Sequence, residues 1–80
     1  MAKAQHGASY RVIPPLLREL RESARLTQRM LGSKLRKPQS WIYNCESANR
    51  RIDVTELIKW AEACGADPMR VLKAVVERLR

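Results

Sequence analysis

The side chains best suited to chemistry lie between Leu26 and Glu46, around a break between two short helical patterns. Gln39 and Asn44 carry amides that pair with the N6 and N7 edge of adenine, and the hydroxyl of Ser40 bonds several base edges. Two short helices with a sharp break, the second beginning with such side chains, form the layout of a helix-turn-helix, whose second helix enters the DNA major groove. The stretch therefore predicts a contact with DNA bases.

No second chemistry in the sequence competes with this prediction. There is no nucleophile–base pair and no Gly-rich phosphate loop, so we expect neither an enzyme nor a small-molecule substrate. Cys45, Cys64 and His6 are too few to hold zinc, so we expect no metal and no cofactor. The two cysteines are predicted to be buried apolar residues in a reducing cytoplasm. No stretch approaches about 18 consecutive apolar residues, which predicts no membrane span.

The basic charge is confined to one part of the chain. The protein has a formal net charge of +8, from 16 Lys and Arg against 8 Asp and Glu. Residues 1–51 hold 11 of the basic residues and 3 of the acidic ones, whereas residues 52–80 hold 5 of each. A basic face on one part of a small domain is typical of proteins that bind a polyanion. Because the surplus coincides with the helix-turn-helix, it indicates double-stranded DNA as the partner.

Five helices are expected to position these groups in an all-α fold. Apolar residues recur at helical spacing in five segments, and the sequence has no strand pattern. We expect a flexible arm over residues 1–12 and a single domain over residues 13–80. Gly65 is expected to end the fourth helix. The helix starts are marked by residues that favour them: Pro14–Pro15, Thr27, Pro38, Asp53 with Glu56 in a capping box, and Asp67–Pro68.

The second and third helices have the spacing that two closely crossing helices require. Gly32 is the small residue near the middle of the second helix, where the third helix crosses it. The apolar anchors between the two helices are predicted to be Leu31, Leu35, Ile42 and Cys45.

On these residues, the chain from about Leu16 to Leu72 resembles the Cro and phage-repressor (XRE-type) helix-turn-helix family. The resemblance is carried by the helix pair, Leu26-Thr27-Gln28, Glu46, Arg50-Arg51 followed by Asp53, and the run AEACGADP. It implies a compact five-helix bundle in which the second and third helices form the helix-turn-helix. It also implies a cytoplasmic homodimer, associated with the nucleoid when bound, that regulates transcription from a near-palindromic operator. We expect a repressor.

The resemblance also implies roles for individual residues. Gln39, Ser40 and Asn44 match positions that read bases, and Tyr43 lies on the same exposed side. Gln28 matches a residue that bonds a DNA phosphate and braces the recognition helix. The residues expected at phosphates are Gln28, Arg29, Lys37, Trp41, Arg50 and Arg51.

Three places depart from the pattern of the family. Arg36 occupies the turn position where the family prefers a left-handed glycine. A non-glycine residue costs about 1 kcal/mol there, so we expect a reshaped turn. Gly32 replaces the usual alanine, which is expected to loosen the helix slightly. Ala48-Asn49 replaces a loop that contains glycine.

Several side chains keep two interpretations at this point. Trp41 either packs beside the turn or lies against the DNA backbone. Gln39 and Ser40 either read bases, which is favoured, or cap the third helix. Trp60 is expected in the core, and Glu46 is expected to pair within the protein with a nearby arginine. The arginines of the first helix are expected to form a solvated face rather than phosphate contacts: Arg18, Arg21 and Arg25.

The fifth helix carries more apolar residues than so small a domain needs. Val71, Val75, Val76 and Leu79 are therefore expected to form a dimer contact. The alternative function is a protein-interaction module of the antitoxin or adaptor type, built on the same fold. The chain beyond residue 72 has no obvious partner-binding tail, so DNA binding is favoured.

Overall fold

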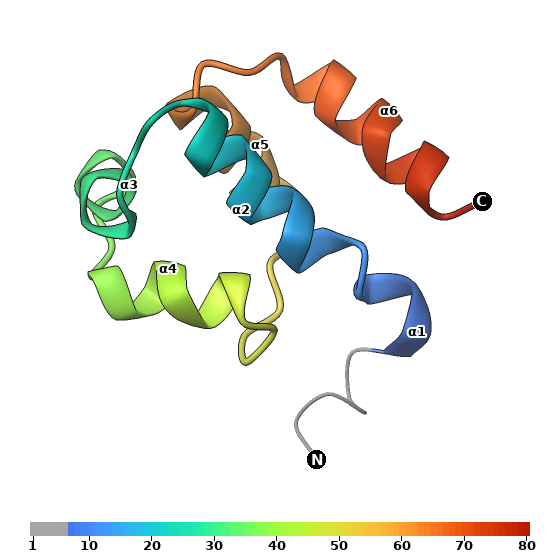
Figure 1. Ribbon diagram of the computed structural model, residues 1–80, viewed down its shortest axis with the longest axis horizontal. Helices are drawn as coiled ribbons and strands as arrows, with labels where there is room; N and C mark the ends of the chain where they lie inside the picture. Colours follow the sequence, from blue (N-terminus) through green and yellow to red (C-terminus); the bar gives the residue numbers. More distant parts are fainter. Residues whose placement is uncertain (1–6) are drawn as a thin grey trace.

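A computed structural model describes residues 7–80, which form helices joined by short loops (Figure 1). Residues 1–6, with His6 and half of the predicted arm, lie outside the described residues. No strand occurs between residues 7 and 80. The five longer helices confirm the predicted all-α fold. The helices are α1 (Gly7–Tyr10), α2 (Ile13–Ser23), α3 (Gln28–Leu35), α4 (Gln39–Glu46), α5 (Val54–Ala63) and α6 (Pro68–Arg78).

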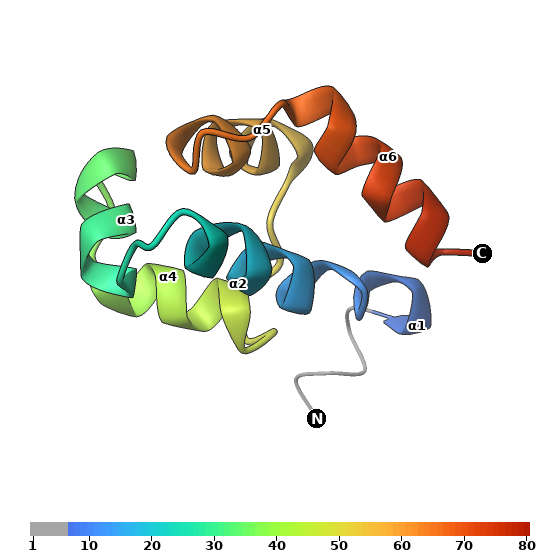
Figure 2. The same ribbon diagram turned by 45° about the horizontal axis from the view of Figure 1, so that its top comes forward.

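The helix pair α3 and α4 lies at the end of the molecule away from α6. Figure 1 and Figure 2 both show α2 passing between this pair and the C-terminal helix, while α5 lies behind α2 in Figure 1 and above it in Figure 2. This arrangement leaves one side of α4 uncovered, which is what a helix that enters a DNA groove requires.

Three of the predicted helix starts are made by side chains that satisfy free backbone N–H groups. At α3, Thr27 Oγ1 accepts a hydrogen bond from the Met30 N–H at 3.0 Å. At α5, the Asp53 carboxylate accepts from the Glu56 N–H at 2.8 Å, and the Glu56 carboxylate accepts from the Asp53 N–H at 3.0 Å. Asp67 caps α6 in a similar way. Caps of this kind each stabilise a helix by about 1 kcal/mol.

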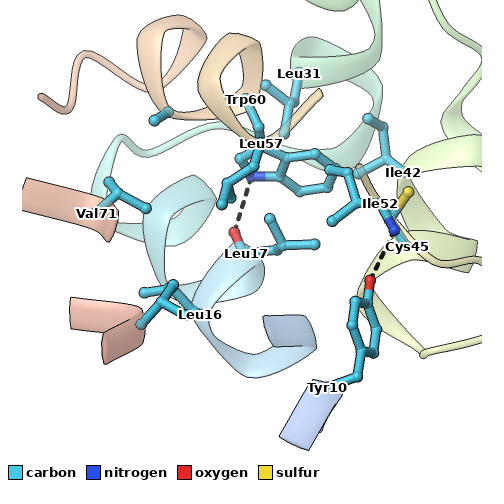
Figure 3. Packing of buried hydrophobic residues seen from close by; sticks show 12 residues of the cluster. Tyr10, Leu16, Leu17, Leu31, Ile42, Cys45, Ile52, Leu57, Trp60 and Val71 are labelled. Carbon is cyan, nitrogen blue, oxygen red and sulfur yellow. Dashed lines mark hydrogen bonds between the residues drawn. The ribbon is translucent and has the colours of Figure 1, made fainter. Parts of the chain in front are cut away.

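The core gathers around Trp60 of α5, whose burial the sequence predicted. The indole N–H of Trp60 donates to the carbonyl oxygen of Leu17 on α2 at 3.1 Å, so its buried polar group is satisfied (Figure 3). Burial of a large apolar side chain contributes about 1.5–3 kcal/mol. Of the predicted anchors, only Leu35 is partly exposed. The largest fully buried side chains come from four helices: Leu17, Leu31, Ile42, Cys45 and Trp60.

Gly32 lies where the turn folds back over α3. A Cβ atom at this position would be 2.6 Å from the Lys37 carbonyl oxygen, which is closer than real side chains approach. The sequence predicted the small residue correctly. It also predicted that glycine in place of alanine would do no more than loosen the helix slightly. Glycine is instead required by the close approach of the backbone.

Three helices end at left-handed residues that are not glycine. Arg36 is the C-cap of α3 with φ 57° and ψ 43°, and its N–H reaches the carbonyl oxygens of Gly32 and Ser33. Arg25 follows α2 with φ 60°, and Ala48 follows α4 with φ 66°. The predicted reshaping of the turn is therefore wrong. Arg36 adopts the left-handed conformation itself, at a cost of about 1–2 kcal/mol.

The boundary predicted between arm and domain also needs correction. Tyr10 of α1 is only 7% exposed, and its hydroxyl accepts a hydrogen bond from the Ile52 N–H at 2.8 Å (Figure 3). A buried ring with a satisfied hydroxyl ties residues 7–12 to the domain. The sequence did not predict this burial, because Tyr10 is a single aromatic residue outside any periodic apolar pattern.

Candidate nucleic-acid interface

The predicted base-reading residues share the uncovered side of α4. Gln39, Ser40 and Tyr43 are exposed and Asn44 is half-buried, while the two apolar anchors of the helix point into the core. Neither Gln39 nor Ser40 caps the helix, because its N-cap is Pro38 and no side chain bonds there. The first turn of α4 therefore presents amide and hydroxyl groups outward.

Asn44 also forms hydrogen bonds with the loop that follows the same helix. The backbone carbonyl oxygen of Asn44 accepts hydrogen bonds from the backbone N–H groups of Asn49 and Arg50, at 2.9 and 3.1 Å. Its side-chain oxygen accepts a longer bond of 3.4 Å from the Asn49 amide. These bonds fix the start of the loop relative to the exposed side of α4.

A chain of hydrogen bonds runs from α2 through α3 to the exposed end of α4. Arg21 donates to both carboxylate oxygens of Glu46, at 2.6 and 3.0 Å. Gln28 Nε2 donates to Glu46 Oε1 at 3.0 Å, and Gln39 Nε2 donates to Gln28 Oε1 at 2.6 Å. Gln39 is therefore held in place by residues of three helices.

The Glu46 carboxylate sets the direction of every bond in this chain. An ionised carboxylate only accepts hydrogen bonds, so Gln28 must turn its NH₂ group toward Glu46 and its oxygen toward Gln39. Gln39 must then donate one of its two N–H groups to Gln28. Its oxygen and its second N–H are left for another partner, and this pair of groups matches the N6 and N7 edge of adenine.

Arg21 corrects the prediction of a solvated face on the first long helix. Its side chain is 11% exposed and that of Glu46 is 5% exposed. Arg21 also donates to the Leu26 carbonyl oxygen at 2.9 Å. Its hydrogen bond to Glu46 raises the pKa of Arg21, so the guanidinium stays charged. Glu46 does pair within the protein, as predicted, while Arg18 remains an exposed partner of Glu22.

The loop after α4 carries two arginines in different surroundings. Arg50 donates to both carboxylate oxygens of Glu56, at 3.2 and 3.1 Å, which lowers the pKa of Glu56. Arg51 is exposed, and its guanidinium lies 5.1 Å from the ring centroid of Tyr10. Within residues 7–80, no carboxylate forms an ion pair with Arg51.

Trp41 packs beside the turn at the edge of the core. It is half-buried, and its ring centroid lies 6.2 Å from that of Trp60. Lys37 Nζ and the Arg50 guanidinium lie 5.2 and 4.8 Å from the Trp41 ring. Of the two interpretations of Trp41, packing beside the turn is the arrangement observed, and its contact with the DNA backbone stays a prediction. Contact with a DNA phosphate also stays a prediction for the other residues expected there: Gln28, Arg29, Lys37, Arg50 and Arg51.

An exposed apolar groove lies between α5 and α6. The predicted dimer residues Val71 and Val75 are only 5% and 9% exposed, because the inner side of α6 packs on the domain's own core. Val76 and Leu79 are exposed. The groove itself was not predicted, since it combines residues of two helices: Val54, Leu57, Ile58, Ala61, Pro68, Met69, Val71 and Leu72.

The two cysteines are free, and burial raises the pKa of each to about 11, so both thiols stay protonated at neutral pH. Cys45 is buried as predicted, whereas Cys64 is half-buried. Between residues 7 and 80, no three His, Cys, Asp or Glu side chains are grouped to hold a metal ion. No helix in that part of the chain has the length and apolarity to cross a membrane.

The crossing at Gly32 and the polar side of α4 define a helix-turn-helix DNA-binding domain. A family model described as a helix-turn-helix domain matches residues 16–74. Among solved structures, an XRE-family like protein from Pseudomonas syringae pv. tomato str. DC3000 is similar, with a TM-score of 0.83 and 36% sequence identity. The match covers 95% of this chain and 93% of that chain. No curated protein matches this chain. The chain belongs to the XRE-type helix-turn-helix family of DNA-binding regulators.

Proposed function

We propose that this protein is a sequence-specific repressor that binds an operator as a homodimer, with α4 in the major groove of double-stranded DNA. The observation that carries the proposal is the hydrogen-bond chain that ends at Gln39 on the exposed side of α4. Residues 1–51 hold the whole net charge of the protein, which supplies the attraction for phosphates.

Gln39 is proposed to read an adenine. Its second N–H donates to N7 and its oxygen accepts from the N6 amino group, which is the bidentate pairing of an amide with this base. Because Gln28 already holds the amide, little side-chain freedom is lost on binding. Ser40, Tyr43 and Asn44 are proposed to contact neighbouring bases from the same side of α4.

The test begins with selection of bound duplexes from a random pool. We expect a palindrome whose half-sites are about one helical turn apart. Gln39→Ala is expected to weaken binding to the selected duplex by about 1–3 kcal/mol and to leave binding to unrelated duplex nearly unchanged. Glu62→Ala, at an exposed position of α5, is the control and should change neither affinity. Recovery of no motif, or equal losses on both duplexes, contradicts the proposal.

The homodimer is proposed to form through the groove between α5 and α6. Exposed apolar patches on small domains usually have a partner, and Met69 and Val54 are 72% and 61% exposed. A second copy is the favoured occupant because a symmetric dimer matches a palindromic operator. A chain that is monomeric alone but purifies with a stoichiometric protein partner would favour the antitoxin or adaptor type of function instead.

Repression is the expected outcome at the promoter. A reporter gene whose promoter carries the selected palindrome should lose output when the protein is produced. A rise in output would make the protein an activator, with the same mode of DNA binding.

A further inference from the structure

Two neighbouring arginines follow the recognition helix, and only one of them is held by a carboxylate. Arg50 is tied to Glu56 by two hydrogen bonds, and it also donates to the Arg51 carbonyl oxygen at 2.9 Å. Arg51 has no carboxylate partner within residues 7–80. A phosphate would have to compete with Glu56 for Arg50, whereas the guanidinium of Arg51 meets no such competition.

Tyr10 holds both the backbone and the side chain at Arg51. Its hydroxyl accepts a hydrogen bond from the N–H of Ile52, the next residue along the chain, at 2.8 Å. Its ring lies under the Arg51 guanidinium, 5.1 Å from centroid to carbon. The ring is itself fixed, since Tyr10 is 7% exposed and part of the core cluster.

A guanidinium held over the face of a ring can still bind an anion. The five N–H donors of arginine lie in the plane of the group and point outward from its edge. A ring below that plane attracts the cation without using any of these donors. Tyr10 can therefore restrict the position of Arg51 while N–H donors of the guanidinium stay available to a phosphate.

We infer that Tyr10 is a positioning residue for DNA binding, which holds Arg51 ready to contact a phosphate beside the recognition helix. The inference rests on the proposed function, because it requires that the loop after α4 approaches DNA. The inference gives the two arginines different roles: Arg51 binds the phosphate, and Arg50 holds the loop against α5.

The test is a double-mutant cycle of Tyr10 and Arg51, with binding to a short duplex of mixed sequence measured over a range of salt concentrations. Tyr10→Leu removes the ring and the hydroxyl, and is expected to weaken binding about two- to fivefold in the wild-type background. Arg51→Ala is expected to weaken binding and to lower the salt slope by about 1. In the Arg51→Ala background, Tyr10→Leu should have almost no further effect on affinity.

Tyr10→Phe is the matched variant, because it keeps the ring under Arg51 and removes only the hydroxyl. Tyr10→Phe is expected to lower thermal stability. In the Tyr10→Phe background, Arg51→Ala should still weaken DNA binding by the same factor as in the wild-type background. A purely structural role of Tyr10 would give equal losses with and without Arg51, and that additivity would overturn the inference. Failure of the wild-type chain to bind any duplex would instead overturn the proposed function, and this inference with it.

A measurement on the wild-type chain decides the matter if Tyr10→Leu does not fold. The guanidinium carbon lies 5.1 Å over the Tyr10 ring centroid, which brings the neighbouring δ-methylene protons of Arg51 near the shielding region of that ring. Proton NMR should therefore find these protons shifted upfield from their random-coil position. Unshifted protons in the folded wild-type protein would overturn the inference.

Discussion

At the scale of single residues, the charge of one buried carboxylate determines what another side chain offers to a ligand. Glu46 accepts from Arg21 and from Gln28, and that choice turns the amides of Gln28 and Gln39 in one direction. The resemblance to the helix-turn-helix family predicted Gln39 on the exposed side of the recognition helix. Its orientation could not be predicted, because Gln28 and Arg21 are 18 and 25 residues from Glu46.

Arg36 supplies a stability prediction at the same scale. Arg36→Gly should stabilise the protein by about 0.5–1 kcal/mol, because the left-handed strain of about 1–2 kcal/mol is partly offset by the greater freedom of glycine in the unfolded chain. Chemical denaturation monitored by circular dichroism measures this difference. Lys59→Gly, at an exposed position in the middle of α5, is the control and should destabilise by about 1 kcal/mol. A loss of stability with Arg36→Gly would mean that the turn is not strained.

At the scale of elements, helix bounds were predictable because their signals are local. Apolar periodicity and capping residues lie within the segment they describe, and Thr27, Asp53 and Asp67 each cap the expected helix. The requirement for glycine at Gly32 was not predictable. It depends on the distance to the Lys37 carbonyl oxygen, which only the path of the turn determines.

The capping box of α5 makes the stability of the protein depend on pH. The pKa of Glu56 is lowered mainly by Arg50, and that of Asp53 mainly by the Glu56 N–H. A carboxyl whose folded pKa lies below its unfolded pKa stabilises above the unfolded value and loses this contribution as the pH falls through the folded value. The unfolding temperature should therefore fall as the pH drops below about 4.

Variants of the same helix test this origin of the acid sensitivity. Glu56→Gln should lower the unfolding temperature at neutral pH by about 4–8 °C, the equivalent of about 1 kcal/mol for a domain of this size. It should also flatten the decline in acid, because one of the responsible carboxyls is gone. Glu62→Gln removes an exposed carboxyl of α5 and should keep the wild-type profile. An unchanged acid decline in Glu56→Gln would exclude the capping box as its cause.

At the scale of the whole molecule, the groove between α5 and α6 carries the prediction of a dimer. Leu72→Lys places a charge at a residue that is 45% exposed and lines the groove. Burying that charge in an apolar interface is unfavourable, so the variant should be monomeric and bind the selected palindrome at least about tenfold more weakly. Analytical ultracentrifugation and operator titration measure the two effects.

Met30→Lys is the matched control for the dimer prediction, since Met30 is an exposed apolar residue of α3 outside the groove. It should keep the oligomeric state of the wild-type chain. A Leu72→Lys variant that still dimerises would exclude this groove as the interface. The sequence pointed to α6 for the dimer contact, but it could not separate Val71 and Val75, which the domain buries in its own core, from Leu72 and Val76 on the outer side.

Trp41 and Trp60 lie with ring centroids 6.2 Å apart and planes inclined by 38°. At that separation, light absorbed by one indole passes readily to the other, so emission from the pair reports on the surroundings of both. Trp60 is fully buried, while Trp41 carries Lys37 against its ring beside the turn. A phosphate that draws Lys37 away from the indole would change the emitted light. We therefore expect the tryptophan emission of the wild-type chain to report DNA binding, so that titrations need no attached dye.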